Sequence, residues 1–430
     1  MAITGRFVLL LALGVLPIVY FGEPLITALW LTGCVLLGAI DLALAASPRQ
    51  VVIDRVPPGR LRLGESVRAA LMLTNTGSRL LRGLVRDGWE PSAGAAATRV
   101  PVRIPAGERR RVEVPLTPFR RGERRTNHLT VRSLGPLGLW ARQATILSAG
   151  VVRVLPPFHS RKHLPSRLAR LQELDGSTAV LVRGQGTEFD SLREYVRGDD
   201  VRSIDWRATA RRNDVMVRTW RPERDRRVVI VIDSGRTSAA RVDNEPRIDT
   251  AFEASLLLAA LADRAGDRVD TIVFDRRVRA RVQGASGANL LSRMVDAMAP
   301  IEPELIEMDW AQVPAQIRRV TSQRALVVLL TAIDTAQSAR GLLSVLPQLT
   351  GKHTVLVASA SDPDVLAATG GREDLAGVYR AAAAERAQLD VSRVSAAVRQ
   401  LGADVVTGSP ADLPPAVADR YIALKAAGRL

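Results

Sequence analysis

The chain has 430 residues, 47% of them hydrophobic, and a formal net charge of +16. This length suggests two or three domains, each able to bury its own core. The single cysteine, Cys34, excludes an internal disulfide framework and cysteine-based zinc fingers. The four histidines show no metalloprotease spacing. We therefore assign no catalytic residue and expect a protein that is not an enzyme.

The positive charge comes almost entirely from arginine, since Lys162, Lys352 and Lys425 are the only lysines. Either the protein binds a polyanion, or its codon usage favours arginine. The arginines are dispersed and lack the interleaved aromatic residues of a base-stacking surface, so we expect no nucleic acid partner. A basic protein tethered to an anionic inner leaflet would be stabilised there by these charges.

Two apolar runs open the chain, Phe7–Gly22 and Leu25–Ile40, with Glu23-Pro24 between them. Each is a little shorter than the roughly 20 residues that a straight spanning helix needs. Extending the second run past Asp41 lets it span, with the carboxylate near an interface. Because arginines flank both ends, the positive-inside rule places both ends in the cytoplasm. We expect a transmembrane hairpin over residues 1–48, which is a multi-pass anchor in the inner (cytoplasmic) membrane. A single anchor and a cleaved signal peptide are the alternatives.

Residues 49–156 alternate apolar and polar residues in short runs separated by turns. Val67–Leu73 and Val100–Ile104 are examples, and the turns Asn75-Thr76-Gly77 and Pro105-Ala106-Gly107 follow them. Several short strands at this spacing predict an all-β sandwich of immunoglobulin-like type. Its expected role is spacing or binding.

Residues 157–221 combine a basic helical linker with a segment dense in both charge signs and in aromatic residues. Within Glu188–Trp220, Phe189, Leu192 and Tyr195 have helical spacing and predict a helix that Gly198 ends. We expect this segment to be structured and to bind a partner through Glu188, Asp199, Asp200, Arg202, Asp205 and Trp206. The alternative is that its charges form an ion-pair network that only ties the neighbouring domains together.

Residues 222–430 alternate buried strands with helices. The expected strands are Val228–Ile232, Val269–Phe274, Ala325–Leu330 and Thr354–Ala358, and a helix is expected over Ile248–Arg264. Strands that are apolar throughout predict a parallel sheet covered on both faces, and hence an α/β fold. In such sheets ligands bind beyond the carboxyl ends of the strands. Asp233 and Asp334 lie at or just after two such ends.

Four stretches resemble the DUF58 family: Thr117–Arg142, Glu188–Trp206, Gly351–Asp364 and Tyr421–Lys425. The resemblance extends over nearly the whole chain. It implies a von Willebrand A-like doubly wound parallel sheet, preceded by the immunoglobulin-like sandwich and the transmembrane helical hairpin. It also implies association with a MoxR-type AAA+ ATPase, and no established enzymatic activity.

Domains of this kind carry a metal-ion-dependent adhesion site, Asp-x-Ser-x-Ser, completed by a threonine and an aspartate from other loops. Here the first loop reads Asp233-Ser234-Gly235-Arg236-Thr237. We expect a degenerate site with Asp233, Thr237 and Asp334 as oxygen ligands for Mg²⁺. Gly235 has replaced the first hydroxyl, and no threonine is evident in the second loop, Ser286–Asn289. If no metal binds, the aspartates form hydrogen bonds within the loops or bind a basic partner. No other cofactor is expected.

The functional expectation is a membrane-anchored cytoplasmic adaptor. One alternative is a metal-assisted hydrolase using Asp233, Asp334 and Asp205, which requires these acids to cluster. The other is a structural membrane protein that binds lipid or polyanions.

Overall fold

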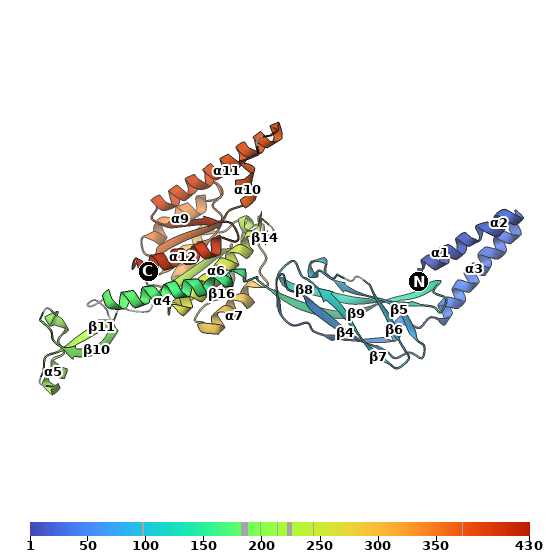
Figure 1. The fold of residues 1–430 in the computed structure, drawn as a ribbon, viewed down its shortest axis with the longest axis horizontal. Helices are drawn as coiled ribbons and strands as arrows, with labels where there is room; N and C mark the ends of the chain where they lie inside the picture. The colour runs from blue at the N-terminus through green and yellow to red at the C-terminus, as the bar shows by residue number, and fades with distance from the viewer. Residues whose placement is uncertain are drawn as a thin grey trace. The chain divides into compact units, whose positions relative to one another are not determined.

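The computed structural model describes residues 1–96, 99–181, 188–197, 199–212, 214–221, 226–243, 245–371 and 373–430, except for the side chains of 174–181, 188–190 and 219–221. The chain divides into two compact units, Met1–Leu155 and Pro156–Leu430 (Figure 1). Each unit is described by itself.

The first unit opens with a helical hairpin. Helices α1 (Gly5–Leu13) and α2 (Val15–Phe21) follow one another and lie beside α3 (Pro24–Leu44) (Figure 1). Within the described part of the chain, one helical stretch, Pro24–Gln50, is long and apolar enough to cross a membrane, and the Gly5–Phe21 stretch is shorter. The structure therefore offers one candidate span, and the expectation of a multi-pass anchor is not supported.

Two sheets make up the rest of the first unit. One has the order β1-β9-β8-β5-β6, with β3 also paired to β9, and the other has the order β2-β4-β7. The strands are β1 (Ala2–Ile3), β2 (Val51–Val56), β3 (Leu61–Arg62), β4 (Val67–Asn75), β5 (Leu81–Trp89), β6 (Val100–Ile104), β7 (Arg109–Leu116), β8 (Gly122–Leu134) and β9 (Trp140–Leu155). Leu71 and Leu73 of β4 share one buried cluster with Leu129 and Val131 of β8, so the core lies between the two sheets.

The second unit is built on a six-stranded sheet of order β16-β15-β12-β17-β18-β19. Its neighbours are parallel except for β16, which is antiparallel to β15. The strands are β12 (Arg227–Asp233), β15 (Arg268–Phe274), β16 (Val278–Val282), β17 (Leu326–Leu330), β18 (Thr354–Ala360) and β19 (Asp404–Gly408). The four apolar runs singled out in the sequence form β12, β15, β17 and β18, and the expectation of a mixed α/β fold is confirmed.

Helices cover this sheet on both faces. On one face, Val229 and Val231 pack with residues of α8, α9 and α11. The alternate residues of β12, including Ile230, are also buried, and α6 and α12 contact the strands and each other. The helices are α6 (Arg247–Arg264), α7 (Gly287–Met298), α8 (Val313–Val320), α9 (Arg340–Thr350), α10 (Pro363–Ala368), α11 (Leu375–Gln400) and α12 (Leu413–Ala426). A two-stranded ribbon, β13 (Arg241–Val242) and β14 (Glu245–Pro246), precedes α6.

In the sequence, η3 (His159–His163) and α4 (Leu164–Leu181) follow β9 and precede the six-stranded sheet. They lead to a small element that we call the β10–β11 module, residues 188–221. It consists of β10 (Glu188–Glu194), η4 (Val201–Ser203), α5 (Trp206–Arg212) and β11 (Met216–Arg221). The helix predicted over this region is wrong, because β10 pairs antiparallel with β11. A short run of spaced apolar residues fits either structure, and pairing with a distant strand decides between them.

Candidate functional site

Asp233 lies at the carboxyl end of β12 and is almost fully buried. Its carboxylate accepts hydrogen bonds from the backbone N–H of Gly235 (2.8 Å), the hydroxyl of Thr237 (3.1 Å) and the hydroxyl of Thr331 (2.7 Å). Thr331 directly follows β17, the parallel neighbour of β12, so one carboxylate joins two strand ends. Burial raises the pKa of Asp233 above its usual range, and these three hydrogen bonds oppose the rise.

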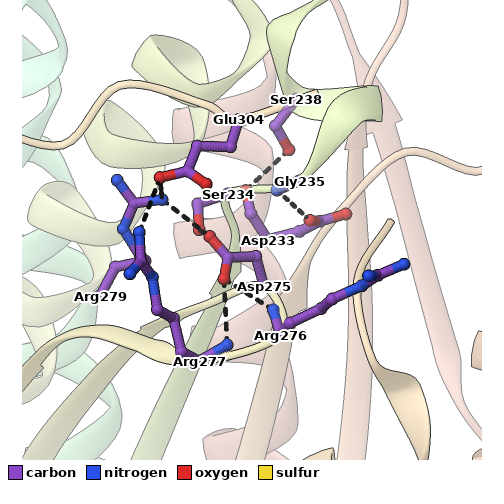
Figure 2. A network of polar contacts seen from close by, with 9 residues as sticks. All are labelled: Asp233, Ser234, Gly235, Ser238, Asp275, Arg276, Arg277, Arg279 and Glu304. Carbon is purple, nitrogen blue, oxygen red and sulfur yellow. Dashed lines mark hydrogen bonds and ion pairs between the residues drawn. The ribbon is translucent and has the colours of Figure 1, made fainter. Parts of the chain in front are cut away.

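A second buried carboxylate, Asp275, follows β15 on the other side of β12 (Figure 2). It accepts hydrogen bonds from the hydroxyl of Ser234 (3.0 Å), the guanidinium of Arg279 (3.0 Å) and the backbone N–H groups of Arg276 and Arg277. Burial acts to raise the pKa of Asp275, but the donors of Arg277, Arg279 and Ser234 hold it below its ordinary value. Sequence reasoning missed this residue. Its position directly after the buried run Val269–Phe274 could have identified it, just as the end of the run Val228–Ile232 identified Asp233.

The segment Glu304–Met308 lies across the end of β12. The backbone N–H of Arg236 donates to the carbonyl of Ile306 (2.7 Å), and that of Glu304 donates to the carbonyl of Ser234 (3.0 Å). A Cβ on Gly235 would lie 2.8 Å from the Ile306 carbonyl oxygen. The glycine that replaces the first hydroxyl of the adhesion motif is therefore required by close approach of another backbone. The Glu304 side chain also binds Arg277 and Arg279 (Figure 2).

The third expected ligand, Asp334, is engaged elsewhere, since both of its carboxylate oxygens accept hydrogen bonds from the Arg247 guanidinium. Mg²⁺ binds oxygen ligands in near-octahedral geometry, and one or two carboxylates usually supply some of these oxygens. Asp233 keeps its three internal donors, and no group of three or more His, Cys, Asp or Glu residues that could hold a metal ion exists among the described residues. The residues present do not fit a Mg²⁺ site.

The β10–β11 module carries the expected partner-binding residues. Asp199 forms an ion pair with Arg193 (2.6 Å) and accepts the backbone N–H of Val196 (2.9 Å). Asp200 accepts the backbone N–H of Arg202 (3.0 Å) at the start of η4. These carboxylates therefore hold the local backbone in place. The Glu188 side chain and Gly198 lie outside the described residues.

Asp205 precedes α5 and accepts the backbone N–H groups of Arg207 and Ala208, both at 3.0 Å. It also pairs with Arg218 of β11 at 2.8 Å. The hydrogen bond from Ala208, followed by that from Arg218, lowers the pKa of Asp205. The neighbouring Trp206, by contrast, is 68% exposed. In this pair Asp205 maintains the fold, and Trp206 is available for contact.

A family profile described as "Protein of unknown function DUF58" matches residues 191–400. Residues 191–400 belong to the DUF58 family. This range contains most of the β10–β11 module together with Asp233, Asp275 and the Glu304–Met308 segment.

Relatives of the chain include the uncharacterized proteins Rv1480 of Mycobacterium tuberculosis (strain H37Rv) and Mb1516 of Mycobacterium bovis. Each is 26% identical over 192 residues, which are 44% of this chain and 60% of the relative. The chain thus spans about 60% of the length of the curated relatives that it matches.

Two solved structures resemble parts of the chain distantly. The VWA domain of SpRpn10 matches with a TM-score of 0.27 and 8% identity. The match covers 45% of this chain and 94% of the SpRpn10 chain. A mutant of the PilB minor pilin from Streptococcus sanguinis has a TM-score of 0.32 and 10% identity, with 85% of each chain covered. Similarity at this level carries no functional argument.

A cavity beside the strand ends of the DUF58 region has a volume of about 10 Å³, and Arg247, Thr331 and Ala358 are among its lining residues. Such a volume holds about one water molecule. This part of the strand edge offers no room for a small-molecule substrate.

The motif Tyr421–Lys425, which contributed to the resemblance, lies on α12 and has a structural role. The Tyr421 hydroxyl donates to Asp267, and the Lys425 ammonium binds the other oxygen of the same carboxylate at 3.0 Å. Asp267 lies between α6 and β15, and all three residues are buried or nearly so. The motif therefore ties α12 to the turn that leads into the sheet.

Proposed function

We propose that this DUF58 protein is a membrane-anchored interaction protein whose C-terminal domain, of von Willebrand A-like type, binds a cytoplasmic protein partner. The observation that carries the proposal is the occupied strand edge. Asp233, Asp275 and the Glu304–Met308 segment fill the place where related α/β folds bind ligands, beyond the ends of β12 and β17. A filled edge with a cavity of about 10 Å³ favours recognition of a surface over turnover of a small molecule.

The strand order supports the von Willebrand A-like assignment. Numbering the sheet strands in chain order gives 3-2-1-4-5-6, with an antiparallel strand at one edge. In this order the chain connections run in opposite directions on the two sides of the β12–β17 pair, so the switch point lies between these strands. The Thr331 hydroxyl donates to the Asp233 carboxylate at this point. The first unit, with its core between two sheets, suits the role of an immunoglobulin-like spacer next to the anchor.

The contact surface includes the β10–β11 module. Val196 is 61% exposed, Val201 62% and Trp206 68%, and arginines surround these apolar side chains in the sequence. Tryptophan and arginine are enriched among the residues that contribute most to protein–protein binding. Another exposed apolar side chain, Leu305 (78%), lies outside the module, in the Glu304–Met308 segment.

We take the partner to be a MoxR-type AAA+ ATPase, which the family resemblance implies, and the anchor to be α3. An 18-residue window of Pro24–Gln50 has a mean hydropathy of 2.0, and 17% of that window is buried within the protein, as expected for a lipid-facing helix. The arginines that follow α3, beginning with Arg49, favour a cytoplasmic location for the rest of the chain.

The test is capture of the co-expressed MoxR-type ATPase by the detergent-solubilised full-length chain, in wild type and in Trp206→Ala. Loss of an exposed aromatic contact is expected to weaken binding about tenfold or more, with an unchanged Tm. The matched control is Leu389→Ala, which removes a 52% exposed side chain from α11. Equal capture of wild type and Trp206→Ala would contradict the assignment of the module.

Asp205→Ala distinguishes an architectural module from a recognition surface. Asp205 holds the start of α5 and Arg218, so its loss is expected to disorder the module and reduce capture. If Asp205→Ala lowers Tm while capture persists, the segment maintains the fold and does not bind the partner. Binding to polyanions of unrelated kinds that falls steeply with salt would instead favour a polyanion-binding protein.

A further inference from the structure

The end of helix α3 is held by the loop that joins β8 to β9, residues 135–139. The Asp41 carboxylate is buried and accepts three backbone hydrogen bonds from this loop and the start of β9: from Leu137 (2.7 Å), Leu139 (2.7 Å) and Trp140 (3.1 Å). A Cβ on Gly135 would lie 2.2 Å from an Asp41 oxygen, so only glycine permits this approach. An acidic side chain near the end of an apolar helix thus serves as a docking point for the sandwich.

The same loop also holds the beginning of the hairpin. The Thr4 hydroxyl donates to the carbonyls of Gly138 (2.7 Å) and Leu139 (2.9 Å), and β1 pairs with the start of β9. The Phe7 ring packs edge-on against Trp140, at 5.4 Å between centroids, and a Cβ on Gly38 would lie within 2.6 Å of the Trp140 ring. Both ends of the hairpin are therefore fixed to one loop, with a buried cluster beneath it.

The helix geometry places this loop at the depth of a bilayer surface. Asp41 lies seventeen residues after Pro24, the first residue of α3. At 1.5 Å per residue this is about 26 Å, compared with about 30 Å for the hydrocarbon core. With Glu23 at the far interface, Asp41 and the loop around it reach the near boundary of the acyl chains.

The composition of the loop agrees with that depth. Leu137, at its tip, is 52% exposed, and the preceding residue, Pro136, is also apolar and exposed. One arginine contacts the loop, since Arg6 donates to the Leu137 carbonyl (3.4 Å). Two more lie at the end of α3, where Arg142 donates to the Leu42 carbonyl (3.0 Å) and Arg79 to the Ala43 carbonyl. An apolar tip beside guanidinium groups fits the boundary between acyl chains and anionic headgroups.

We propose that the β8–β9 loop is a membrane-interface element that rests on the bilayer beside α3. Leu137 enters the acyl-chain boundary, Arg6 and Arg79 lie at the phosphates, and the Asp41 carboxylate locks the loop to the anchor. The partner of this surface is a lipid bilayer containing anionic headgroups. The inference rests on the proposed membrane anchoring and adds a second, sandwich-borne contact that fixes the orientation of the first unit.

The test uses the full-length chain in vesicles of phosphatidylethanolamine and phosphatidylglycerol. In a Cys34→Ala background, an environment-sensitive fluorophore is attached at Leu137→Cys, at Leu31→Cys in α3, or at Leu147→Cys. Leu147 is 88% exposed on β9 and serves as the matched control. Each vesicle set contains lipids with a nitroxide quencher either near the carbonyl or midway along the acyl chain.

We expect the fluorophore at position 31 to lose more fluorescence with the deep quencher, that at 137 to lose more with the shallow one, and that at 147 to remain unquenched. Quenching at 31 with none at 137 would overturn the inference while leaving the anchor intact. No quenching at 31 would refute the anchor itself, and the inference with it.

The locking role of Asp41 has its own readout. Asp41→Ala removes the acceptor of three backbone hydrogen bonds and is expected to reduce shallow quenching at 137 while leaving deep quenching at 31 unchanged. Unchanged quenching at both positions would show that the loop reaches the bilayer without the carboxylate, which contradicts the lock.

Discussion

At the scale of single residues, buried charges hold the strands of both units. In the first unit the Arg55 guanidinium makes two hydrogen bonds to Asp87, at 2.9 and 2.7 Å, and a third to the Ser148 carbonyl at 3.0 Å. The pair links β2 to β5 and β9, and its side chains are 11% and 1% exposed. A Cβ on Gly150 would lie 3.0 Å from the Arg55 chain, so the glycine leaves room for the arginine.

Arg55→Met is expected to destabilise the first unit by about 3–5 kcal/mol, because Asp87 would remain buried without its counter-charge. For a unit of this size, thermal unfolding of the purified chain should show a fall in Tm of roughly 10 °C. The double variant Arg55→Met with Asp87→Leu removes both charges and should recover most of the loss. A single variant as stable as the wild type would show that the pair contributes little.

Asp233 predicts a pH dependence whose sign follows from its raised pKa. A carboxyl group with a raised pKa in the folded state favours folding at low pH, and this contribution is lost as pH rises from its ordinary value of 3.8 through the folded pKa. Relative to Asp233→Asn, which does not titrate, the wild-type chain should lose stability as pH rises across this window. The measurement is the difference in Tm between the two proteins at successive pH values. A difference that grows in favour of wild type would contradict the assignment.

At the scale of elements, the loop over β12 decides what the strand edge can hold. Gly235→Ser would restore the first hydroxyl of an adhesion motif, but its Cβ would meet the Ile306 carbonyl at 2.8 Å. The Glu304–Met308 segment therefore fills the place that a ligand would take, and it also requires a glycine at position 235.

We expect Gly235→Ser to lower stability by about 1–3 kcal/mol through overpacking, and Mg²⁺ to leave the Tm of both wild type and variant unchanged. Gly371→Ser is the matched control, since its Cβ would meet no atom within 4 Å. The measurement is thermal unfolding with Mg²⁺ or with a chelator. A Mg²⁺-dependent rise in Tm, abolished by Asp233→Ala, would restore the metal site to the mechanism.

At the scale of the whole molecule, the two units have separate cores. The described clusters that contain Leu71 or Leu116 lie within Met1–Leu155, and the one that contains Val229 lies within Pro156–Leu430. Each unit is large enough to bury a core of its own.

A chain that begins at Pro156 is therefore expected to fold alone and to unfold in one cooperative transition. Its Tm should agree with that of one transition of the full-length chain, measured by calorimetry. A fragment that lacks a cooperative transition would show that the second unit needs the first.

The sequence by itself determined the features that local patterns encode. Continuous apolar runs located β12, β15, β17 and β18, and alternation located β4 and β6. These patterns are reliable because a strand buried on both faces must be apolar throughout, and one buried on a single face must alternate. Asp233 was found for the same reason, since it ends such a run.

Only the tertiary structure decided which groups the polar residues contact. Glu188–Glu194 became a strand because Met216–Arg221 supplies its hydrogen bonds. Asp334 pairs with Arg247, eighty-seven residues away, and Asp41 with a loop ninety-six to ninety-nine residues away. Sequence periodicity describes which face of an element is buried, but the partner of a charge depends on which distant backbone approaches it. For this reason the metal ligands expected from the motif did not form one group, whereas the carboxylate expected at a membrane interface became the contact between α3 and the loop that joins β8 to β9.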